Sequence, residues 1–181
     1  MSLSLQNRHA LEGHISGFSS FSNANHLSIV RGVAVISVLV QPQRAEDARR
    51  ALATIAESSA RSCGPFEWLI VSETRSADSL LQEAISLDAA SVDQSDGRVV
   101  MRIAGPDVRR ILGKCVAVDL HPDSFAEGYS ANLLIARIGA NLARLAGDCF
   151  EIVVDRSNAV WLFEELVARG REFDLSAGFV G

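Results

Sequence analysis

Cysteine is scarce in this chain of 181 residues, and the three cysteines form no motif. Cys63, Cys115 and Cys149 are odd in number and widely separated, and no Cys-x-x-Cys pair occurs. A disulfide framework or a structural zinc site needs closer or paired spacing. We therefore interpret the three cysteines as small buried hydrophobic residues of a protein in a reducing compartment.

Long apolar runs are missing too. The stretch Gly32 to Val40 is apolar, but it is about half as long as the ~20 residues with which a helix spans hydrocarbon. Near the N-terminus, Arg8, His9, Glu12 and His14 interrupt any apolar run, which does not fit a secretory signal. The sequence therefore predicts a cytoplasmic protein that has no membrane segment.

The chain also lacks an excess of positive charge. Its formal net charge is −5, with 17 basic against 22 acidic residues, whereas a nucleic-acid surface needs a concentrated basic face. The densest basic group is Arg98, Arg102, Arg109, Arg110 and Lys114. We interpret this group as the solvated side of a strand and a helix, and we expect no nucleic-acid partner.

Motifs that carry chemistry by themselves are absent from the sequence. Neither Gly-x-Gly-x-x-Gly nor the Walker pattern occurs, so no phosphate loop is indicated. Gly-x-Ser-x-Gly, the nucleophile elbow, is missing as well. The four histidines add little, since His9, His14 and His26 lie in a polar leader and His121 stands alone before a proline.

Three residues could in principle form a thiol dyad or a metal site, namely Cys115, Asp119 and His121. A populated thiolate needs a nearby cation or a helix N-terminus, whereas Cys115 follows the expected C-terminus of a helix, which would raise its pKa. Asp119 and His121 lie two residues apart and offer only two metal ligands. A shaped loop in which Asp119 or His121 caps backbone groups is the favoured interpretation.

Aromatic and acidic side chains give no stronger signal. Trp68, Trp161 and Tyr129 would suit stacking on a flat ligand, but core or interface packing is favoured for the two tryptophans. Glu164 and Glu165 form an exposed helical pair without a sign of a raised pKa. We therefore assign no catalytic, cofactor-binding or metal-ligating residue to this chain.

What is present is the composition of a globular protein, with 48% hydrophobic and 22% charged residues. The length suits one domain or two small ones that share a core. Residues 1–27 are predicted to form an arm, whose Leu11, Ile15, Phe18 and Phe21 suggest docking on a partner or on the protein body. Simple disorder of this arm is an equally good alternative.

The remaining residues, 28–181, are predicted to form a body with halves at about 28–95 and 96–181. In the first half we expect a strand over 29–40, or two strands kinked near Gly32, a helix over 43–62, a strand over 67–71, a helix capped by Ser76 and a strand near 89–94. Asp96-Gly97 resembles a hairpin turn.

The second half is predicted to begin with an alternating strand at 98–103, followed by a short helix that opens at Gly105-Pro106. An antiparallel meander follows at 131–138, 141–145 and 149–154, with turns at Gly139-Ala140 and Gly147-Asp148, and Ser157 caps a helix that stops at Gly170. This order predicts an α+β fold, with antiparallel sheets, helices packed on one side and two small ferredoxin-like halves.

Five motifs in order carry a resemblance to a known family over roughly residues 30–170. They are Glu67-Trp68-Leu69, the stretch Val92 to Arg98, Ile103-Ala104-Gly105-Pro106 with Asp119-Leu120-His121-Pro122, Leu133 to Arg137, and Arg156-Ser157 with Trp161. With these motifs the chain resembles the gamma subunit of heterotetrameric sarcosine oxidase. It departs from the family in the order of Gly113-Lys114-Cys115 and in a short region between Ser62 and Phe66.

The resemblance implies a fold like that of the glycine-cleavage aminomethyltransferase and its folate-binding relatives. It implies partners, the alpha, beta and delta subunits, in a complex that oxidatively demethylates sarcosine to glycine and passes the one-carbon unit to tetrahydrofolate. FAD, FMN, NAD, zinc and tetrahydrofolate are expected on or between the other subunits. The gamma subunit of this family has no assigned catalytic residue, and its role would be to stabilise the large subunit.

Two other functions stay open. One is a free-standing folate-binding protein or aminomethyltransferase, for which the chain is short. The other is the equivalent subunit of a related N-methyl amino acid dehydrogenase, whose substrate would be chosen by a different chain. If the subunit role holds, exposed Phe, Trp and Leu side chains should form a contiguous apolar patch.

Overall fold

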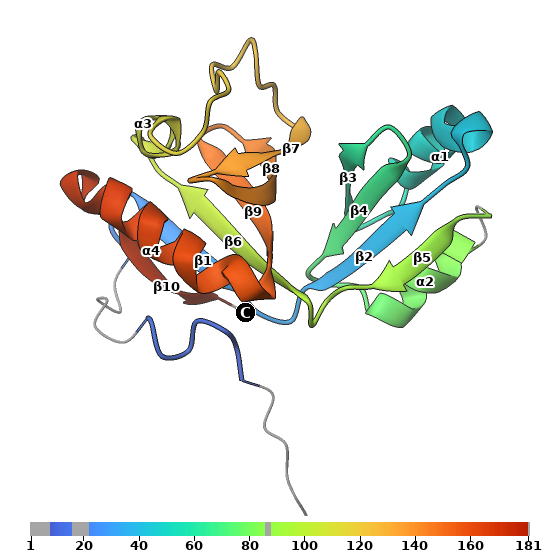
Figure 1. Ribbon diagram of the computed structural model, residues 1–181, viewed down its shortest axis with the longest axis horizontal. Coiled ribbons are helices and arrows are strands. Elements are labelled where there is room, and N and C mark those ends of the chain that lie inside the picture. The colour runs from blue at the N-terminus through green and yellow to red at the C-terminus, as the bar shows by residue number, and fades with distance from the viewer. Residues whose placement is uncertain (1–7, 16–21, 86–87, 181) are drawn as a thin grey trace, which may run out of the picture.

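The computed structural model describes residues 8–15, 22–85 and 88–180 and contains two β-sheets, each with helices on one face (Figure 1). The two sheets lie side by side like the arms of a V. The predicted α+β fold, built from antiparallel sheets, is confirmed.

The four-stranded sheet contains β2 (Ala34–Leu39), β3 (Ser59–Gly64), β4 (Glu67–Ser72) and β5 (Ala90–Asp93) in the order β3-β4-β2-β5. Every neighbouring pair is antiparallel. The short η1 (Pro42–Arg44), α1 (Ala45–Leu52) and α2 (Ala77–Ile85) complete a strand–helix–strand–strand–helix–strand order, which is that of a ferredoxin-like half. Ser76 caps α2, since its Oγ accepts a hydrogen bond from the Ser79 amide at 3.3 Å.

The six-stranded sheet contains β1 (His26–Val30), β6 (Arg98–Ala104), β7 (Ser130–Ile135), β8 (Ile138–Ala146), β9 (Cys149–Asp155) and β10 (Ser176–Val180) in the order β10-β1-β6-β9-β8-β7. Its helical segments are α3 (Val108–Gly113), η2 (Arg156–Asn158), α4 (Ala159–Gly170) and η3 (Arg171–Phe173). The meander β7-β8-β9 is confirmed. β1 joins this sheet from far away in the chain, pairing antiparallel with β6 and parallel with β10.

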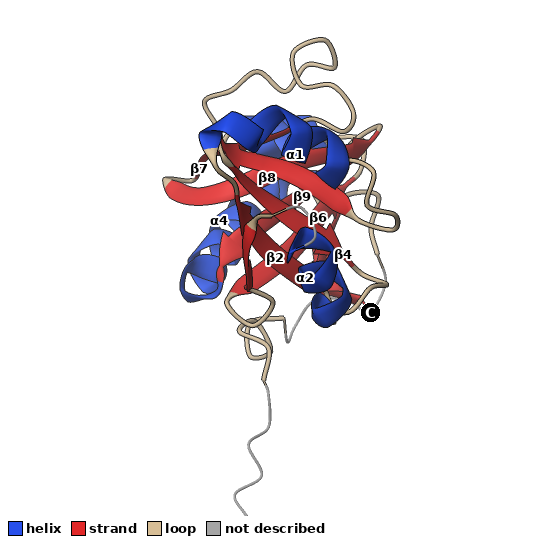
Figure 2. Cartoon of the chain, turned by 90° about the vertical axis from the view of Figure 1, so that its right-hand side faces the viewer, coloured by secondary structure: helices blue, strands red, loops and turns tan. Residues whose placement is uncertain are grey.

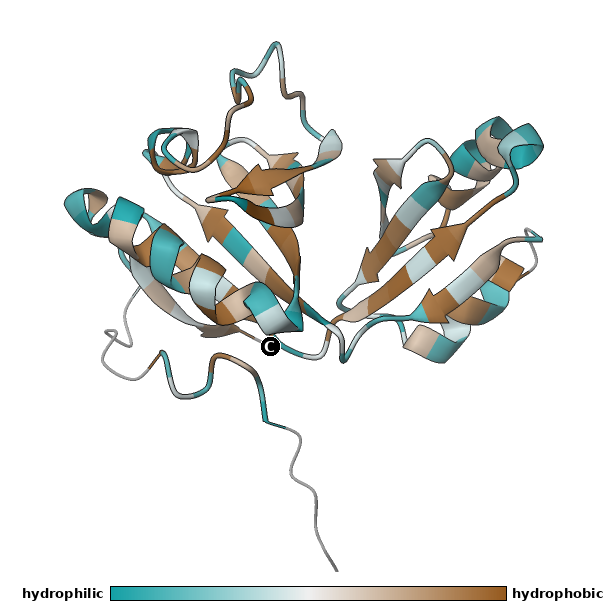
Figure 3. Cartoon of the chain, viewed as in Figure 1, coloured by the Kyte–Doolittle hydropathy of each residue, from teal (hydrophilic) through white to brown (hydrophobic). Residues whose placement is uncertain are grey.

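Three apolar clusters hold the layers together. The largest packs α3 and α4 on the six-stranded sheet, and a second packs α1 and α2 on the four-stranded sheet. The third, Val30, Val35, Leu69, Val71, Val100 and Val153, packs the two sheets against each other. The apolar face of each helix therefore turns toward its own sheet, as the colouring in Figure 3 shows for α4.

The described part of the N-terminal arm docks on the body of the protein. Leu11 is fully buried in the largest apolar cluster, and Ala10 and Ile15 pack against that cluster. Docking on the body, one of the interpretations of this arm, therefore holds for residues 8–15. Phe18 and Phe21 lie outside the described residues.

Several helix and strand boundaries predicted from the sequence were wrong. The helix expected over 43–62 ends near Leu52, and β3 occupies 59–64. Neither β3 nor β10 was expected. Ser157 lies inside η2 rather than capping α4, whose N-cap is Asn158 and makes no side-chain capping bond.

Two predicted turns also need correction. The turn at Asp96-Gly97 exists, with the Gly97 amide donating to Gln94 O at 2.9 Å, but it connects the two sheets instead of joining a hairpin. The turn expected at Gly139-Ala140 lies at Ala136-Arg137, because Ile135 and Ile138 are already paired. Figure 2, turned by 90°, shows the four-stranded sheet with α1 and α2 in front of the six-stranded sheet.

Candidate functional site

The loop between α3 and β7, which carries the Asp-Leu-His-Pro motif, is shaped by Asp119. Its carboxylate accepts hydrogen bonds from the His121 amide at 2.8 Å and from the Ser124 hydroxyl at 2.9 Å. These bonds, the amide first, lower the pKa of Asp119. The interpretation of Asp119 as a residue that caps backbone groups is confirmed.

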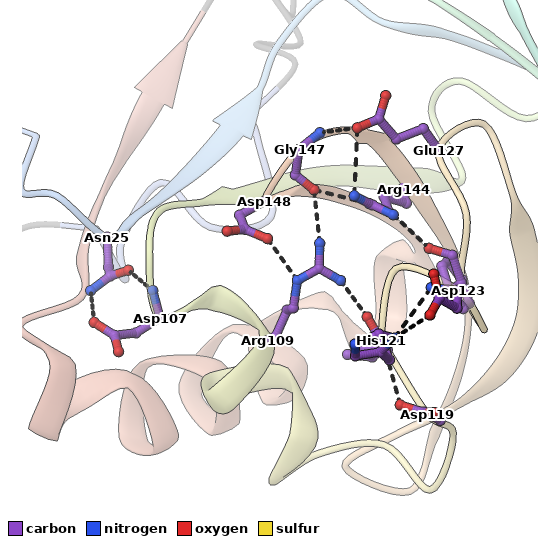
Figure 4. A network of polar contacts seen from close by, with 12 residues as sticks. Asn25, Asp107, Arg109, Asp119, His121, Asp123, Glu127, Arg144, Gly147 and Asp148 are labelled. Atoms are coloured by element: carbon purple, nitrogen blue, oxygen red, sulfur yellow. Dashed lines mark hydrogen bonds and ion pairs between the residues drawn. The ribbon is translucent and has the colours of Figure 1, made fainter.

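Two arginines fasten this loop to the turn between β8 and β9 (Figure 4). Arg109, from α3, donates to the Asp148 carboxylate at 2.6 Å, to Gly147 O at 3.1 Å and to Leu120 O. Arg144, from β8, donates to Gly147 O at 2.9 Å and to Phe125 O at 3.0 Å. Both guanidinium groups are thus engaged by backbone carbonyls together with the carboxylates of Asp148 and Glu127, so they act as structural braces.

Apolar side chains complete the loop's attachment. Leu120 and Phe125 are buried in the largest cluster, and Phe125 contacts Tyr129 edge-to-face with ring centroids 4.9 Å apart. Tyr129 itself is about half exposed. The motif that carried the resemblance is therefore a rigid structural loop, held by two arginines and two buried side chains.

The thiol dyad considered from the sequence is not assembled. Cys115 donates its S–H weakly to Ile111 O at 3.7 Å, whereas the His121 ring lies 3.4 Å from the Asp123 carboxylate and is exposed. The pKa of Cys115 is raised, as expected, but burial rather than the helix C-terminus is the main cause. Within the described ranges, no three His, Cys, Asp or Glu side chains gather to hold a metal ion.

Gly105-Pro106 and Asp107 form a second rigid joint with Asn25, at the left of Figure 4. Asn25 is buried, accepts from the Asp107 amide at 2.9 Å and donates to the Asp107 carboxylate at 3.2 Å. That bond, followed by one from Arg110, lowers the pKa of Asp107. Gly105, with φ of 140°, passes so close to Ala24 and Asn25 that a side chain would collide with their backbone.

Each basic residue singled out from the sequence meets a carboxylate. Arg98 pairs with Asp155 at 2.7 Å, Arg110 with Asp107 at 2.8 Å, and Lys114 with Glu172. Arg109 pairs with Asp148, and Arg102 with Glu151 and Glu73. The interpretation as a solvated side was wrong for Arg98 and Arg102, which lie on the face toward the other sheet and are only partly exposed.

That inner face holds a buried cluster of charges. Arg61 of β3 is 1% exposed and pairs with Glu151 of β9, which is 2% exposed. Arg102 donates its Nε to the same Glu151 carboxylate at 2.9 Å. The cluster spans the two sheets and fixes how they pack. It could not be predicted from the sequence, because Arg61 and Glu151 are 90 residues apart.

Beside this cluster, a cleft of about 470 Å³ lies between β3–β4 and β7–β8. It is lined by Cys63, Glu67, Leu69, Arg98, Asn132, Leu133, Leu134, Gly139, Ala140, Asn141 and Asp155. Asn132 donates to Cys63 O at 2.9 Å and Asn141 to Ser62 O at 3.1 Å, so the edges of the two sheets are joined here. Burial, with a smaller contribution from Glu67, raises the pKa of Cys63 to about 11.

The two tryptophans differ in burial. Trp68 is buried in the core under α1 and α2, as predicted, whereas Trp161 is 58% exposed on α4.

The remaining acidic and histidine candidates form local contacts. Glu164 is exposed and lies 3.5 Å from His14, and Glu165 pairs with Arg169 at 3.1 Å. His26, on β1, lies 2.6 Å from the Ser176 hydroxyl, and His9 contacts Phe179 edge-to-face.

Comparison with known proteins supports the fold. The chain resembles one in the heterotetrameric sarcosine oxidase from Corynebacterium sp. U-96, solved with pyrrole 2-carboxylate, with a TM-score of 0.77 and 20% identity over 99% of this chain and 100% of that one. It also resembles glycine cleavage system aminomethyltransferase T from Bartonella henselae, with a TM-score of 0.59 and 15% identity over 87% of this chain. It spans 48% of that transferase.

At these identities the two structures show a shared fold only. No curated protein matches the sequence of this chain. None of the helices in the described residues combines the length and apolarity needed to cross a bilayer. The model of the sarcosine oxidase gamma subunit family, however, matches residues 37–169. With the braced loop, the two sheets and this match taken together, the chain belongs to the sarcosine oxidase gamma subunit family.

Proposed function

We propose that this chain is a non-catalytic gamma subunit of a heterotetrameric sarcosine oxidase and stabilises the large subunit of that complex. The family match over residues 37–169 carries the proposal. Its structural support is that Arg109, Arg144 and Asp119 are all engaged with the protein's own backbone. Large apolar side chains such as Leu134 and Trp161 are meanwhile exposed.

In this proposal the partners are the alpha, beta and delta subunits, and the whole complex converts sarcosine to glycine with transfer of the one-carbon unit to tetrahydrofolate. FAD, FMN, NAD, zinc and tetrahydrofolate are held on or between those other subunits. The complex works in the cytoplasm, which is consistent with Cys63, Cys115 and Cys149 being free thiols.

The chain is proposed to consist of an arm, residues 1–27, and a gamma-like body, residues 28–181, with halves at about 28–95 and 96–181. The connection at residues 94–97, which leads from the four-stranded to the six-stranded sheet, supports a division there. β1 is the exception, because it precedes the first sheet in the chain and pairs in the second.

Co-expression tests the proposal directly. The full chain is expressed with the alpha, beta and delta subunits, with an affinity tag on the alpha subunit, and the purified material is examined for all four chains and for flavin absorbance. Co-purification in constant ratio, with more soluble alpha subunit than without this chain, is expected. A chain that stays monomeric in gel filtration and leaves the yield of the alpha subunit unchanged would contradict the proposal.

A free-standing folate-binding protein is the second candidate, and the aminomethyltransferase fold favours it. Titration of the isolated chain with tetrahydrofolate, followed by tryptophan fluorescence, separates the two, because the subunit proposal expects no saturable change. The related N-methyl amino acid dehydrogenase differs only in substrate, which would be chosen by another chain. Turnover of different N-methyl amino acids by the purified complex therefore decides between these two subunit roles.

A further inference from the structure

The inner faces of the two sheets are packed together only in part. The apolar cluster of Val35, Leu69, Val71, Val100 and Val153 with Val30 joins them. Residues paired across antiparallel strands point to the same side of a sheet. Leu39 pairs with Glu67, and Val92 with Ser37, so both share a face with Leu69 and Val71. The four-stranded sheet thus continues its apolar inner face beyond the contact with its neighbour.

The opposite wall shows the same feature. Leu134 pairs with Gly139, and Asn141 with Val153, which places Leu134 on the inner face of the six-stranded sheet. Leu39 is 54%, Val92 56% and Leu134 62% exposed. Three of the most exposed large apolar side chains in the described residues therefore face inward rather than away from the molecule.

The polar lining of the cleft selects a type of partner. Arg98 and Asp155 neutralise each other, whereas the exposed Glu67 carboxylate forms no ion pair within the described residues. Cys63 stays uncharged at neutral pH because its pKa is about 11. The cleft thus offers apolar walls and one free negative charge. Such a surface fits an apolar segment that carries a lysine or an arginine.

Two further atoms indicate that this face is incomplete in the isolated chain. Arg98 Nε and Asn141 Oδ1 are buried and have no hydrogen-bond partner within the described residues, and both side chains line the cleft. Buried polar groups are normally hydrogen-bonded. A rearrangement that accompanies binding would allow these groups to be satisfied.

We propose that the cleft between β3–β4 and β7–β8, together with Leu39 and Val92, receives an apolar segment of the large subunit that carries a lysine or arginine opposite Glu67. This inference rests on the proposed subunit function and adds the surface and the chemistry of contact. The partner segment covers the exposed apolar side chains, and its cation pairs with the Glu67 carboxylate.

The test uses the tagged co-expression described above, with two cleft variants and two matched controls. Leu134→Ser removes apolar surface from the cleft, and Glu67→Lys reverses its charge. Ile85→Ser and Asp47→Lys make the same changes on α2 and α1, which cover the outer face of the four-stranded sheet. All four side chains are exposed, so circular dichroism and thermal melting are expected to show an intact fold.

At least a tenfold loss of this chain from the purified complex is expected for each cleft variant, with the controls retained as in the wild type. Equal retention of all variants, or equal loss in cleft and control variants, would overturn the cleft as docking site while the wild-type result still supports the subunit function. If the wild-type chain fails to co-purify, both the proposed subunit function and the docking cleft are contradicted.

Hydrogen exchange on the wild-type complex gives a second measurement that requires no variant. Slower exchange of the amides in β5 and β7 is expected once the large subunit is bound. Protection confined to α4 around Trp161 would overturn the cleft. Self-association of the isolated chain that is abolished by Leu134→Ser would also overturn it, since a second copy would then be the occupant.

Discussion

The buried guanidinium of Arg61 illustrates how much one residue can decide in this protein. It lies on β3 and pairs with Glu151 on β9, and both side chains are almost fully buried. Removing one partner of such a pair leaves an uncompensated charge without water. The contact between the two sheets therefore depends strongly on the Glu151 carboxylate, which Arg102 also binds.

Glu151→Gln is expected to lower the free energy of unfolding by about 3–5 kcal/mol, because Arg61 loses its buried counter-charge. Urea unfolding followed by circular dichroism measures this effect. Glu46→Gln is the matched control, since Glu46 pairs with Arg49 on the fully exposed side of α1 and its removal should change nothing measurable. Equal stability of both variants would contradict a structural role for the buried cluster.

Gly105→Ala is expected to destabilise the fold by about 2 kcal/mol or more, since φ is 140° and the new methyl group meets the Ala24 and Asn25 backbone. Gly32→Ala is its control, because Gly32 has a positive φ of 66° but open space around it. The loss of stability there should stay at about 1 kcal/mol. Thermal melting of both variants measures the two losses of stability. Equal losses would show that the close approach of Gly105 to Ala24 and Asn25 does not matter.

Cys63 predicts a dependence on alkaline pH. Its folded pKa of about 11 exceeds the ordinary value of 9.0. The stability that it contributes is therefore complete below pH 9 and is lost as the pH rises through 11. Iodoacetamide alkylation of a Cys115→Ala, Cys149→Ala protein should stay slow at pH 9 and accelerate toward pH 11. Adding Glu67→Gln should shift this acceleration to lower pH, because the carboxylate that raises the pKa of Cys63 is then gone. A half-maximal alkylation rate near pH 9 in the protein that retains Glu67 would contradict burial of the thiol.

Among the elements, those with a strong local pattern could be predicted from the sequence. The apolar run of β4 and the capped, amphipathic α2 lie where the sequence placed them. β3 could not be predicted, because its sequence SARSCG has little apolar character and its one buried residue is an arginine whose partner is distant in the sequence. β10 is a short edge strand, stabilised by parallel pairing with β1 rather than by a pattern of its own.

Some features of the candidate site could likewise be predicted from the sequence, and others could not. The capping role of Asp119 follows from its spacing to His121 and Ser124, so it could be predicted. The bracing by Arg109 and Arg144 could not, since both arginines bind carbonyls that only the folded turn at Gly147 presents. The cleft could not be predicted from the sequence either, because its walls belong to two different sheets.

The β7–β8 turn stores strain that a substitution can release. Ala136 and Arg137 both have positive φ, 49° and 71°, in a two-residue hairpin connection. Turns of this type favour Asn-Gly. Ala136→Asn with Arg137→Gly is expected to stabilise the protein by about 1–2 kcal/mol. Thermal melting measures the gain, and no increase would mean that the turn relaxes or that contacts of Arg137 offset the strain.

On the scale of the whole molecule, the position of β1 decides how the chain can be divided. β1 lies between β10 and β6, so the six-stranded sheet is not made by the second half alone. The four-stranded sheet, in contrast, uses only residues 34–93 and the helices between its strands. The two halves of the chain are therefore unequal in what they contain.

Residues 96–181, produced alone, are expected to be largely unfolded or aggregated, because the edges of β6 and β10 face an empty strand position. Co-expression with residues 1–95 should restore a soluble, cooperatively melting protein. Circular dichroism and gel filtration of both samples give the comparison. A fragment 96–181 that folds by itself would show that β1 is dispensable to the second half.

The pairing of β1 with β10 also sets the order in which the six-stranded sheet can be completed during translation. A ribosome releases the chain from the N-terminus onward, so β1 emerges before β6 and can pair with it once residues 98–104 have been made. Its other edge waits until residues 176–180 appear, later than every other strand. During that interval the nascent polypeptide exposes one unpaired edge of β1, and we expect this edge to be prone to aggregation until β10 has been made.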